Sequence, residues 1–141
     1  MKFISRSVKQ TEELAFKLAK RLNRGDCIAY RGGLGAGKTA FTRGLAKGLG
    51  IEDDVMSPTF SLVNQYEGDV ILYHFDMYRI ENEDDLYMTG FFDYLDSDGI
   101  LAIEWSENIQ SALPEDTIYV TIEKMDNDAN TRQITIQGRE I

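Results

Sequence analysis

The feature that most constrains this chain is the segment RGGLGAGKTAFTRGLAKGLG, residues 31–50. Gly32, four further residues and then Gly37-Lys38-Thr39 match the pattern G-x-x-x-x-G-K-[ST]. The apolar run CIAY before it predicts a short buried strand over 27–30. The residues after it predict a helix that begins near Lys38 and fades through Gly48 and Gly50. Glycines between a strand and a helix let backbone N–H groups turn inward around phosphate oxygens, beside the positive end of the helix.

The loop predicts a site for a nucleoside triphosphate with magnesium. Lys38 can reach the β- and γ-phosphates, and the Thr39 hydroxyl can bind Mg²⁺. The loop residues expected to contact the nucleotide are Gly32, Gly33, Leu34, Gly35, Ala36, Gly37, Lys38, Thr39 and Ala40. The alternative is a glycine-rich turn with a solvated lysine, which we disfavour because a lysine inside such a turn has little packing reason to be there.

Two acids follow apolar strands and are candidates to complete this site. Glu104 ends ILAIE, in the form expected of a Walker B element, and Asp76 ends VILYHFD. Magnesium on a nucleotide usually takes one or two carboxylates besides phosphate and water. We assign Glu104 to the metal and Asp76 to the attacking water, as the group that orients or deprotonates it, although the two roles can be exchanged. An acid at a strand end is also commonly just solvated.

The order of helical and strand patterns predicts an α/β fold. Capping-box spacing of Ser7 and Gln10 begins a helix with a stripe of Leu14, Leu18 and Leu22, which Gly25 is placed to end. Hairpins are expected within residues 59–76, around a turn at 67–69, and within 117–138, around 125–130. A short helix is expected at 83–88, capped by Asn82, and a small helix or loop within 91–99 leads to the apolar strand ILAIE. We predict a single P-loop NTPase-like domain over 1–141, with a mixed β-sheet, flanking helices and antiparallel hairpins.

Composition excludes several function classes. The net charge is −9 and the isoelectric point is about 4.6, so a basic surface for nucleic acid is not expected. Cys27 is the one cysteine; a disulfide framework or cysteine-based metal site within the chain is excluded, and Cys27 itself reads as a small buried hydrophobe. No signal peptide or membrane-spanning pattern is present, which predicts a cytoplasmic protein without membrane contact.

Other chemically capable residues have two interpretations. Ser57-Pro58-Thr59 is either a switch that senses the γ-phosphate or a plain proline turn. His74, on a strand, is expected to be a hydrogen-bonded core residue rather than a catalytic one. Arg79 can contact phosphate or pair with the acids after it, and we favour the pair. Trp105 is expected in the core, although its place after Glu104 would border the site.

Several of these stretches together resemble one family. RGGLGAGKTAFTRGLAKGLG, SPTFSLVNQY, YHFDMYRI and LAIEWSE occur in this order and at fitting distances over about residues 7–125, closely similar to the TsaE family of bacterial ATPases. The resemblance implies a small P-loop ATPase that binds ATP and Mg²⁺ and acts with TsaB and TsaD. That pair transfers threonylcarbamoyl to adenosine 37 of tRNA, forming t6A. TsaE-like proteins do not transfer the group; their ATP hydrolysis is thought to reset the TsaB–TsaD complex, and they meet tRNA only indirectly.

The resemblance also implies residue roles. Gly35 to Ala40 would hold phosphates, Thr39 and Glu104 would bind Mg²⁺, and Asp76 would take part in hydrolysis. Thr11 in the first helix and Arg132 in the last hairpin lie where the family places nucleotide contacts. One departure is Gly33, which stands where the family usually has an acid. The phosphate cradle should survive this change because backbone groups make it.

Three alternatives differ in function class. A small-molecule kinase needs an acceptor pocket and usually an arginine-bearing lid, and the 15 Lys and Arg show no lid-like cluster. A GTPase should carry Asn-Lys-x-Asp after the loop, whereas the nearest string, NRGD at 23–26, precedes it and lacks the lysine. The non-enzyme alternative is a nucleotide-dependent binding module with negligible hydrolysis. An ATPase measurement with and without TsaB and TsaD separates these from the TsaE-like function.

Overall fold

The computed structural model describes residues 1–33, 36–56, 62–125 and 128–141. Its strands are β1 (Lys2–Ser5), β2 (Cys27–Arg31), β3 (Val63–Tyr66), β4 (Leu72–Asp76), β5 (Ile100–Glu104), β6 (Ile118–Met125) and β7 (Asp128–Gln137). Its helices are α1 (Val8–Ala19), α2 (Lys38–Gly48), α3 (Glu83–Met88), α4 (Phe91–Leu95) and the 3₁₀ segment η1 (Ser106–Ala112).

The strands form one mixed sheet in the order β1-β7-β6-β2-β5-β4-β3. The four central strands β6, β2, β5 and β4 run parallel, while β3, β7 and β1 pair antiparallel at the two sides. This confirms the predicted α/β class and both hairpins. The central position of β2 matters most, because parallel strands in such sheets present ligand sites at their carboxyl ends.

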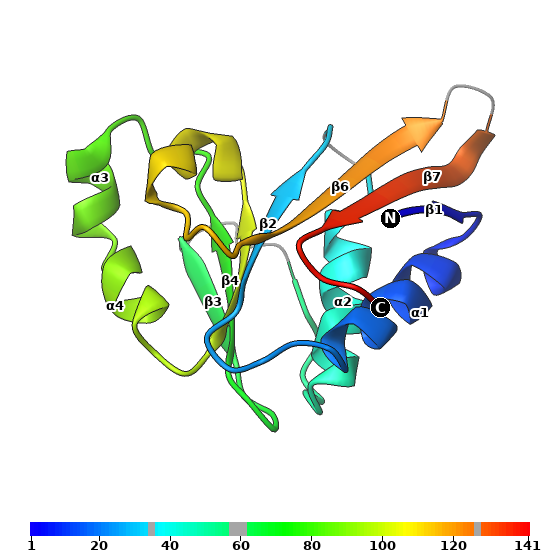
Figure 1. Cartoon of the computed structure of the whole chain (residues 1–141), viewed down its shortest axis with the longest axis horizontal. Coiled ribbons are helices and arrows are strands. Elements are labelled where there is room, and N and C mark those ends of the chain that lie inside the picture. The colour runs from blue at the N-terminus through cyan, green and yellow to red at the C-terminus, as the bar shows by residue number, and fades with distance from the viewer. Residues whose placement is uncertain (34–35, 57–61, 126–127) are drawn as a thin grey trace.

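Residues alternate between the two faces of the sheet. Leu72, Ile100 and Ala102 point into one hydrophobic cluster together with residues of α1 and α2. Their strand neighbours Tyr73 and Leu101 point into a second cluster with residues of α3, α4 and η1. We call the two sides the α1–α2 face and the α3–η1 face; Figure 1 shows α3 and α4 at the left of the view and α1 and α2 at the right, with β2, β3 and β4 between them.

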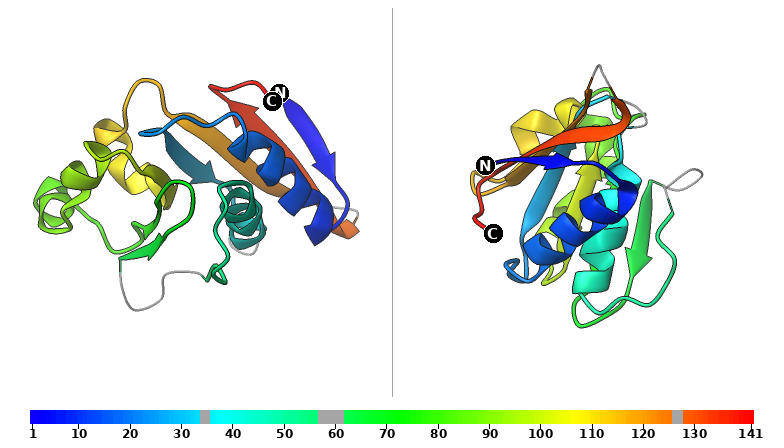
Figure 2. Two further views of the ribbon diagram at one scale, coloured as in Figure 1. Left: turned by 90° about the horizontal axis from the view of Figure 1, so that it is seen from below. Right: turned by 90° about the vertical axis from the view of Figure 1, so that its right-hand side faces the viewer.

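Small residues let α1 and α2 approach closely on their face. A Cβ added to Gly44 would lie 2.2 Å from the Glu12 carbonyl oxygen, and one added to Gly48 would lie 2.4 Å from the Ala19 Cβ. Glu12 also accepts from the Arg43 Nε across the same interface, at 3.1 Å. The two helices lie side by side in both views of Figure 2. Close backbone contact therefore fixes α2 against α1, while large side chains of α2 such as Phe41 and Leu45 pack into the core.

The start of α1 follows the sequence prediction, but its end does not. The Ser7 Oγ accepts from the Gln10 N–H at 3.1 Å, while the Gln10 side chain accepts from the N–H of Arg6 rather than Ser7. The helix ends at Ala19, so the expected end at Gly25 was wrong. Residues 20–26 form turns instead, and Gly25, with φ +88°, donates its N–H to the Gly99 carbonyl before β2 begins.

The sequence prediction missed two elements. Strand β1 is four residues long and pairs with β7, placing Ser5 opposite Arg132. The Met1 carbonyl accepts from the Ile136 N–H, so the N-terminus lies on the last strand, close to the C-terminus (Figure 1). The other is η1, which follows β5 and covers part of the α3–η1 face. Both are too short to show a periodic pattern.

Candidate functional site

The glycine-rich loop joins the end of β2 to the start of α2 at the centre of the parallel strands. Gly32 has φ +118°, and a Cβ there would lie 1.9 Å from the Ile122 carbonyl oxygen of β6. Gly37, the N-cap of α2, has φ +115°. Only glycine adopts these conformations without strain, and only glycine fits at Gly32. Leu34 and Gly35 lie outside the described residues.

The N-terminus of α2 has the properties of an anion site. In the described part of the chain no side chain caps it, and the first N–H groups of a helix have no intrahelical acceptor. Lys38 is the first helical residue and is half-buried, Thr39 is half-buried beside it, and Ala36 and Ala40 are buried. A polyanion placed here would meet backbone amides, the helix dipole and the Lys38 ammonium group together.

A buried hydrogen-bond chain fixes this helix start against β2. The Thr42 Oγ1 donates to the Lys38 carbonyl at 2.8 Å and lies 2.7 Å from the Tyr30 hydroxyl. Because Thr42 donates its proton to Lys38, its oxygen accepts from Tyr30. Tyr30 is fully buried, and this burial raises the pKa of its phenol. The sequence analysis did not identify Tyr30 or Thr42, since nothing local indicates that they touch.

The two candidate acids are brought side by side. Asp76 and Glu104 are register partners at the carboxyl ends of the parallel strands β4 and β5. By strand alternation both lie on the α1–α2 face, the side on which α2 packs, and Glu104 is 15% exposed. The Asp76 Oδ1 accepts from the Tyr78 N–H at 2.9 Å. The sheet order thus places Glu104 on the strand next to β2, which leads into the loop, and Asp76 on the strand after that.

His74 is a buried, hydrogen-bonded residue as expected, and its partner is Glu104. The His74 Nε2 lies 2.6 Å from the Glu104 Oε2. We assign the proton to Nε2, because a carboxylate only accepts. The Nδ1 has no hydrogen-bond partner among the described residues. The contact ties one oxygen of Glu104 to the sheet and leaves the other for a ligand.

Arg132 and Thr11 lie near the loop in different ways. The Arg132 Nε donates to the Ala36 carbonyl at 2.8 Å, so this side chain contacts the loop directly. Thr11 is 3% exposed, and its Oγ1 lies 2.7 Å from the Oγ of Ser5, the register partner of Arg132. Thr11 is therefore bonded to the β1 residue that pairs with Arg132, and its hydroxyl already has a hydrogen-bond partner.

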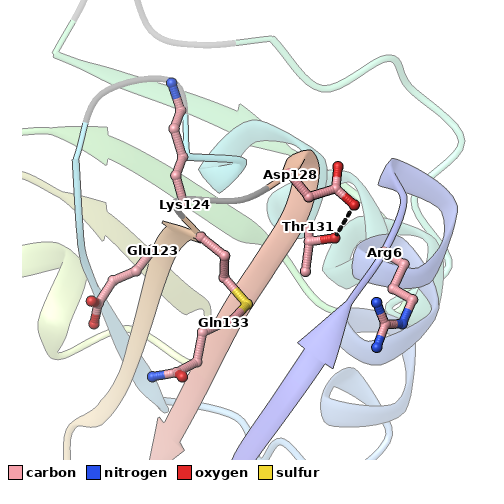
Figure 3. A pocket seen from close by; sticks show the side chains of 7 residues that line it. Arg6, Glu123, Lys124, Asp128, Thr131 and Gln133 are labelled. Atoms are coloured by element: carbon pink, nitrogen blue, oxygen red, sulfur yellow. Dashed lines mark hydrogen bonds between the residues drawn. The ribbon is translucent and has the colours of Figure 1, made fainter.

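A cavity of about 550 Å³ lies between Arg6 and the ends of β6 and β7 (Figure 3). Its lining includes Lys124, Asp128, Thr131 and Gln133, and the Thr131 Oγ1 donates to the Asp128 Oδ2 at 2.8 Å. The Asn130 N–H, then the Thr131 hydroxyl and the nearby guanidinium groups, lower the pKa of Asp128. The cavity is polar and carries both signs of charge.

Trp105 borders the two acids on the other face of the sheet. It is half-buried and has φ +57°, the one positive φ outside glycine among the described residues. Its ring meets the ring of Tyr78 at a centroid distance of 5.0 Å. A bulky residue in this conformation is strained, and such strain is concentrated at functional sites.

The other residues singled out in the sequence have different outcomes. Arg79 is exposed and takes part in no ion pair among the described residues, so the favoured pairing with the following acids was wrong; a solvated arginine gains little there. Cys27 is buried as expected, and burial raises the pKa of its thiol to about 12. Ser57, Pro58 and Thr59 lie outside the described residues.

The described residues contain no group of three or more His, Cys, Asp and Glu side chains that could hold a metal ion. A magnesium ion at Glu104 would need oxygens from phosphate and water as well, which is its usual coordination. Across the described part of the chain, none of the helices has the length and apolar character needed to cross a membrane.

Comparisons with known proteins agree with this geometry. The family model for "Threonylcarbamoyl adenosine biosynthesis protein TsaE" matches residues 5–134. Two proteins named tRNA threonylcarbamoyladenosine biosynthesis protein TsaE are similar over most of their length. The one from Treponema pallidum is 38% identical over 96% of this chain and 99% of its own. The one from Bacillus subtilis is 37% identical over 92% and 81%. The crystal structure of Bacillus subtilis YdiB superposes with a TM-score of 0.78 at 31% identity, over 96% of this chain and 83% of that one. The chain belongs to the TsaE family.

Proposed function

We propose that this protein is a magnesium-dependent ATPase that hydrolyses ATP to ADP and phosphate and supports t6A formation together with TsaB and TsaD. One observation carries the proposal: a glycine loop and an uncapped helix start follow the central strand β2, and carboxylates end the next two strands of the sheet, β5 and β4. Membership of a family described by threonylcarbamoyl adenosine biosynthesis supports the biological setting.

Residues of the loop would hold the phosphates. Gly32 and Gly37 provide the conformations in which backbone amides converge, and the chain between them runs from Gly33 through Ala36. Lys38 would neutralise charge on the β- and γ-phosphates. The fixed contacts Arg132–Ala36 and Tyr30–Thr42 hold the two ends of this cradle before any ligand binds. Arg132 and Thr11 would contact the rest of the nucleotide.

Thr39 and Glu104 would bind Mg²⁺. When bound, the ion would neutralise the negative charge that develops on the phosphate during hydrolysis. The fit rests on the donor set: a hydroxyl on the first turn of α2 and a carboxylate with one oxygen held by His74. The His74 contact would keep Glu104 from turning away and so preserve its direction toward the loop.

Asp76 would orient the attacking water or accept its proton. It stands on the strand beyond Glu104 and is register-paired with it, so one carboxylate can face the metal while the other faces the water. Its bond from the Tyr78 N–H fixes the position of one oxygen. Exchange of the two roles between Asp76 and Glu104 is the variant of this mechanism that the experiment must separate.

The test is ATP turnover of the purified chain with and without TsaB and TsaD. We expect phosphate release to rise when the partners are added and to be lost when EDTA removes magnesium. Glu104→Gln and Asp76→Asn keep side-chain shape but remove charge, and each should lower stimulated turnover about 100-fold or more. If Glu104 binds the metal, its variant should also lose the magnesium-dependent part of nucleotide affinity, whereas Asp76→Asn should retain it.

Three results would overturn the proposal. Turnover that both variants retain in full would remove the acids from the mechanism. A turnover rate that TsaB and TsaD leave unchanged but that rises with a sugar or nucleoside would assign the protein to the small-molecule kinases. Measurable nucleotide binding with no turnover under either condition would leave a binding module.

A further inference from the structure

Acidic and basic residues are distributed unevenly along this chain. Residues 80–123 hold 12 of the 24 Asp and Glu and none of the 15 Lys and Arg. This segment includes α3, α4 and η1. Ion pairs among the described residues use Glu12, Asp26 and Glu104, and none uses an acid of those three helices. Their charge is therefore not offset by basic neighbours within the described residues.

The same helices expose apolar side chains. Tyr87 is 70% exposed and Met88 is 88% exposed at the end of α3. A groove of about 350 Å³ lies between α3 and η1, lined in part by Tyr87, Phe92 and Asn108. Exposed tyrosine and methionine beside a groove are typical of protein interfaces, where aromatic and methionine side chains are enriched. We call this the α3–η1 groove.

We propose that the α3–η1 groove is the docking site for a partner protein that presents basic residues around an apolar side chain. The occupant follows from charge complementarity. The uncompensated acids attract lysine and arginine and repel the phosphates of a nucleic acid. A second copy of this chain is also disfavoured, because each copy carries a net charge of −9. The apolar side chains supply the contact area that charge alone does not.

The groove is linked to the ends of β4 and β5. Its lining residue Asn108 donates from Nδ2 to the Met77 carbonyl at 2.9 Å, directly after Asp76. Tyr78, the next residue, is 63% exposed and donates its N–H to Asp76, while its ring meets Trp105. Trp105 in turn follows Glu104. A partner seated on η1 would therefore contact Asn108, which is bonded to the residue after Asp76, from the face opposite α2.

The inference rests on the proposed function, because the probe is the purified TsaB–TsaD complex. Its affinity for the full chain is measured with two variants on α3, Tyr87→Ala and Asp84→Lys. Their matched controls on α1, at the other face, are Phe16→Ala, an aromatic residue 41% exposed, and Glu13→Lys, an exposed acid. Each variant is also tested for ADP affinity and thermal melting, which should stay unchanged.

We expect each α3 variant to weaken binding at least about tenfold and to lower the partner-stimulated ATP turnover, while the α1 controls stay within about twofold. Binding of the wild type should also weaken as salt rises. If all four variants bind TsaB–TsaD as tightly as the wild type, or if only the two α1 variants bind more weakly, the docking site is overturned while the proposed function stands. Self-association abolished by Tyr87→Ala would overturn it in favour of a second copy. A wild type that does not bind TsaB–TsaD at all would overturn the proposed partner and this site together.

Discussion

The helices on the two faces of the central sheet are held by different kinds of contact. On the α1–α2 face, glycine and alanine bring two helix backbones into contact, with Gly44 against Glu12 and Ala15. On the α3–η1 face, aromatic rings fill the space, and Phe91 meets the rings of Phe75 and Phe92 at 5.5 and 5.6 Å.

The difference follows from what each face positions. Backbone contact leaves α2 little freedom, and α2 carries at its start the amides of the phosphate loop. On the other face, side-chain packing supports the groove between α3 and η1. One face is therefore suited to a rigid ligand site and the other to a macromolecular contact. Variants on each face test whether the two faces act independently.

The largest expected effect is in the aromatic cluster. Phe91→Ala removes a fully buried ring and should lower the free energy of unfolding by about 4 kcal/mol, the usual cost of a large cavity. Urea denaturation measures this. ADP affinity of the folded fraction should stay unchanged, because the ring lies on the face away from α2. An affinity that falls in step with stability would show that the two faces do not act independently.

The next effect is on the ligand site itself. Lys38→Ala should weaken binding of a non-hydrolysable ATP analogue at least about 100-fold, or about 2.7 kcal/mol, since the proposed site has the ammonium group facing the phosphates. The matched control is Lys47→Ala on the same helix, where the side chain is 65% exposed and reaches Glu12. Calorimetry should find the control within about twofold of the wild type. Undiminished affinity of Lys38→Ala would refute the site.

The helix contact should respond to an added methyl group rather than a lost one. A Cβ at Gly44 would lie 2.2 Å from the Glu12 carbonyl oxygen and 2.7 Å from the Ala15 Cβ. We expect Gly44→Ala to cost about 2 kcal/mol of unfolding free energy, although alanine favours helices, because backbone atoms cannot move aside. Thermal melting measures the change. A stabilised variant would mean that α1 and α2 separate easily and that α2 is not fixed by this contact.

Local patterns predicted the elements around the site. The strand, glycine loop and helix over residues 27–48 follow from an apolar run, backbone freedom and helical periodicity, all within neighbouring residues. The hairpins and the Asn82 cap were predicted for the same reason, and the cap is present, with its side chain accepting from the Asp85 N–H. The end of α1 was predicted wrongly because residues 20–26 form turns, so the helix ends before it reaches Gly25, the glycine that was expected to end it.

The contacts that complete the site depend on sheet order and register. His74 meets Glu104 only because β4 and β5 are parallel neighbours, and Arg132 reaches Ala36 only because β7 folds back along β6. The sequence placed Arg132 near the nucleotide through family resemblance, without indicating that it bonds to the loop itself. No pattern within a few residues reports such pairings, so they need either the structure or aligned relatives.

The smallest effect separates two adjacent glycines of the loop. A Cβ at Gly33 meets nothing within 4 Å, whereas one at Gly32 would lie 1.9 Å from the Ile122 carbonyl oxygen. Gly33→Glu, which introduces the acid typical of TsaE-like proteins, should therefore change the unfolding free energy by no more than about 0.5 kcal/mol. ATP affinity should change less than about threefold, because backbone groups make the cradle. Gly32→Ala should cost clearly more in both measurements, through the clash and its positive φ. Equal losses at the two positions in parallel melting and calorimetry would show that Gly33 also holds a backbone conformation that only glycine supplies, and the cradle would then begin one residue later than the contact with β6 indicates.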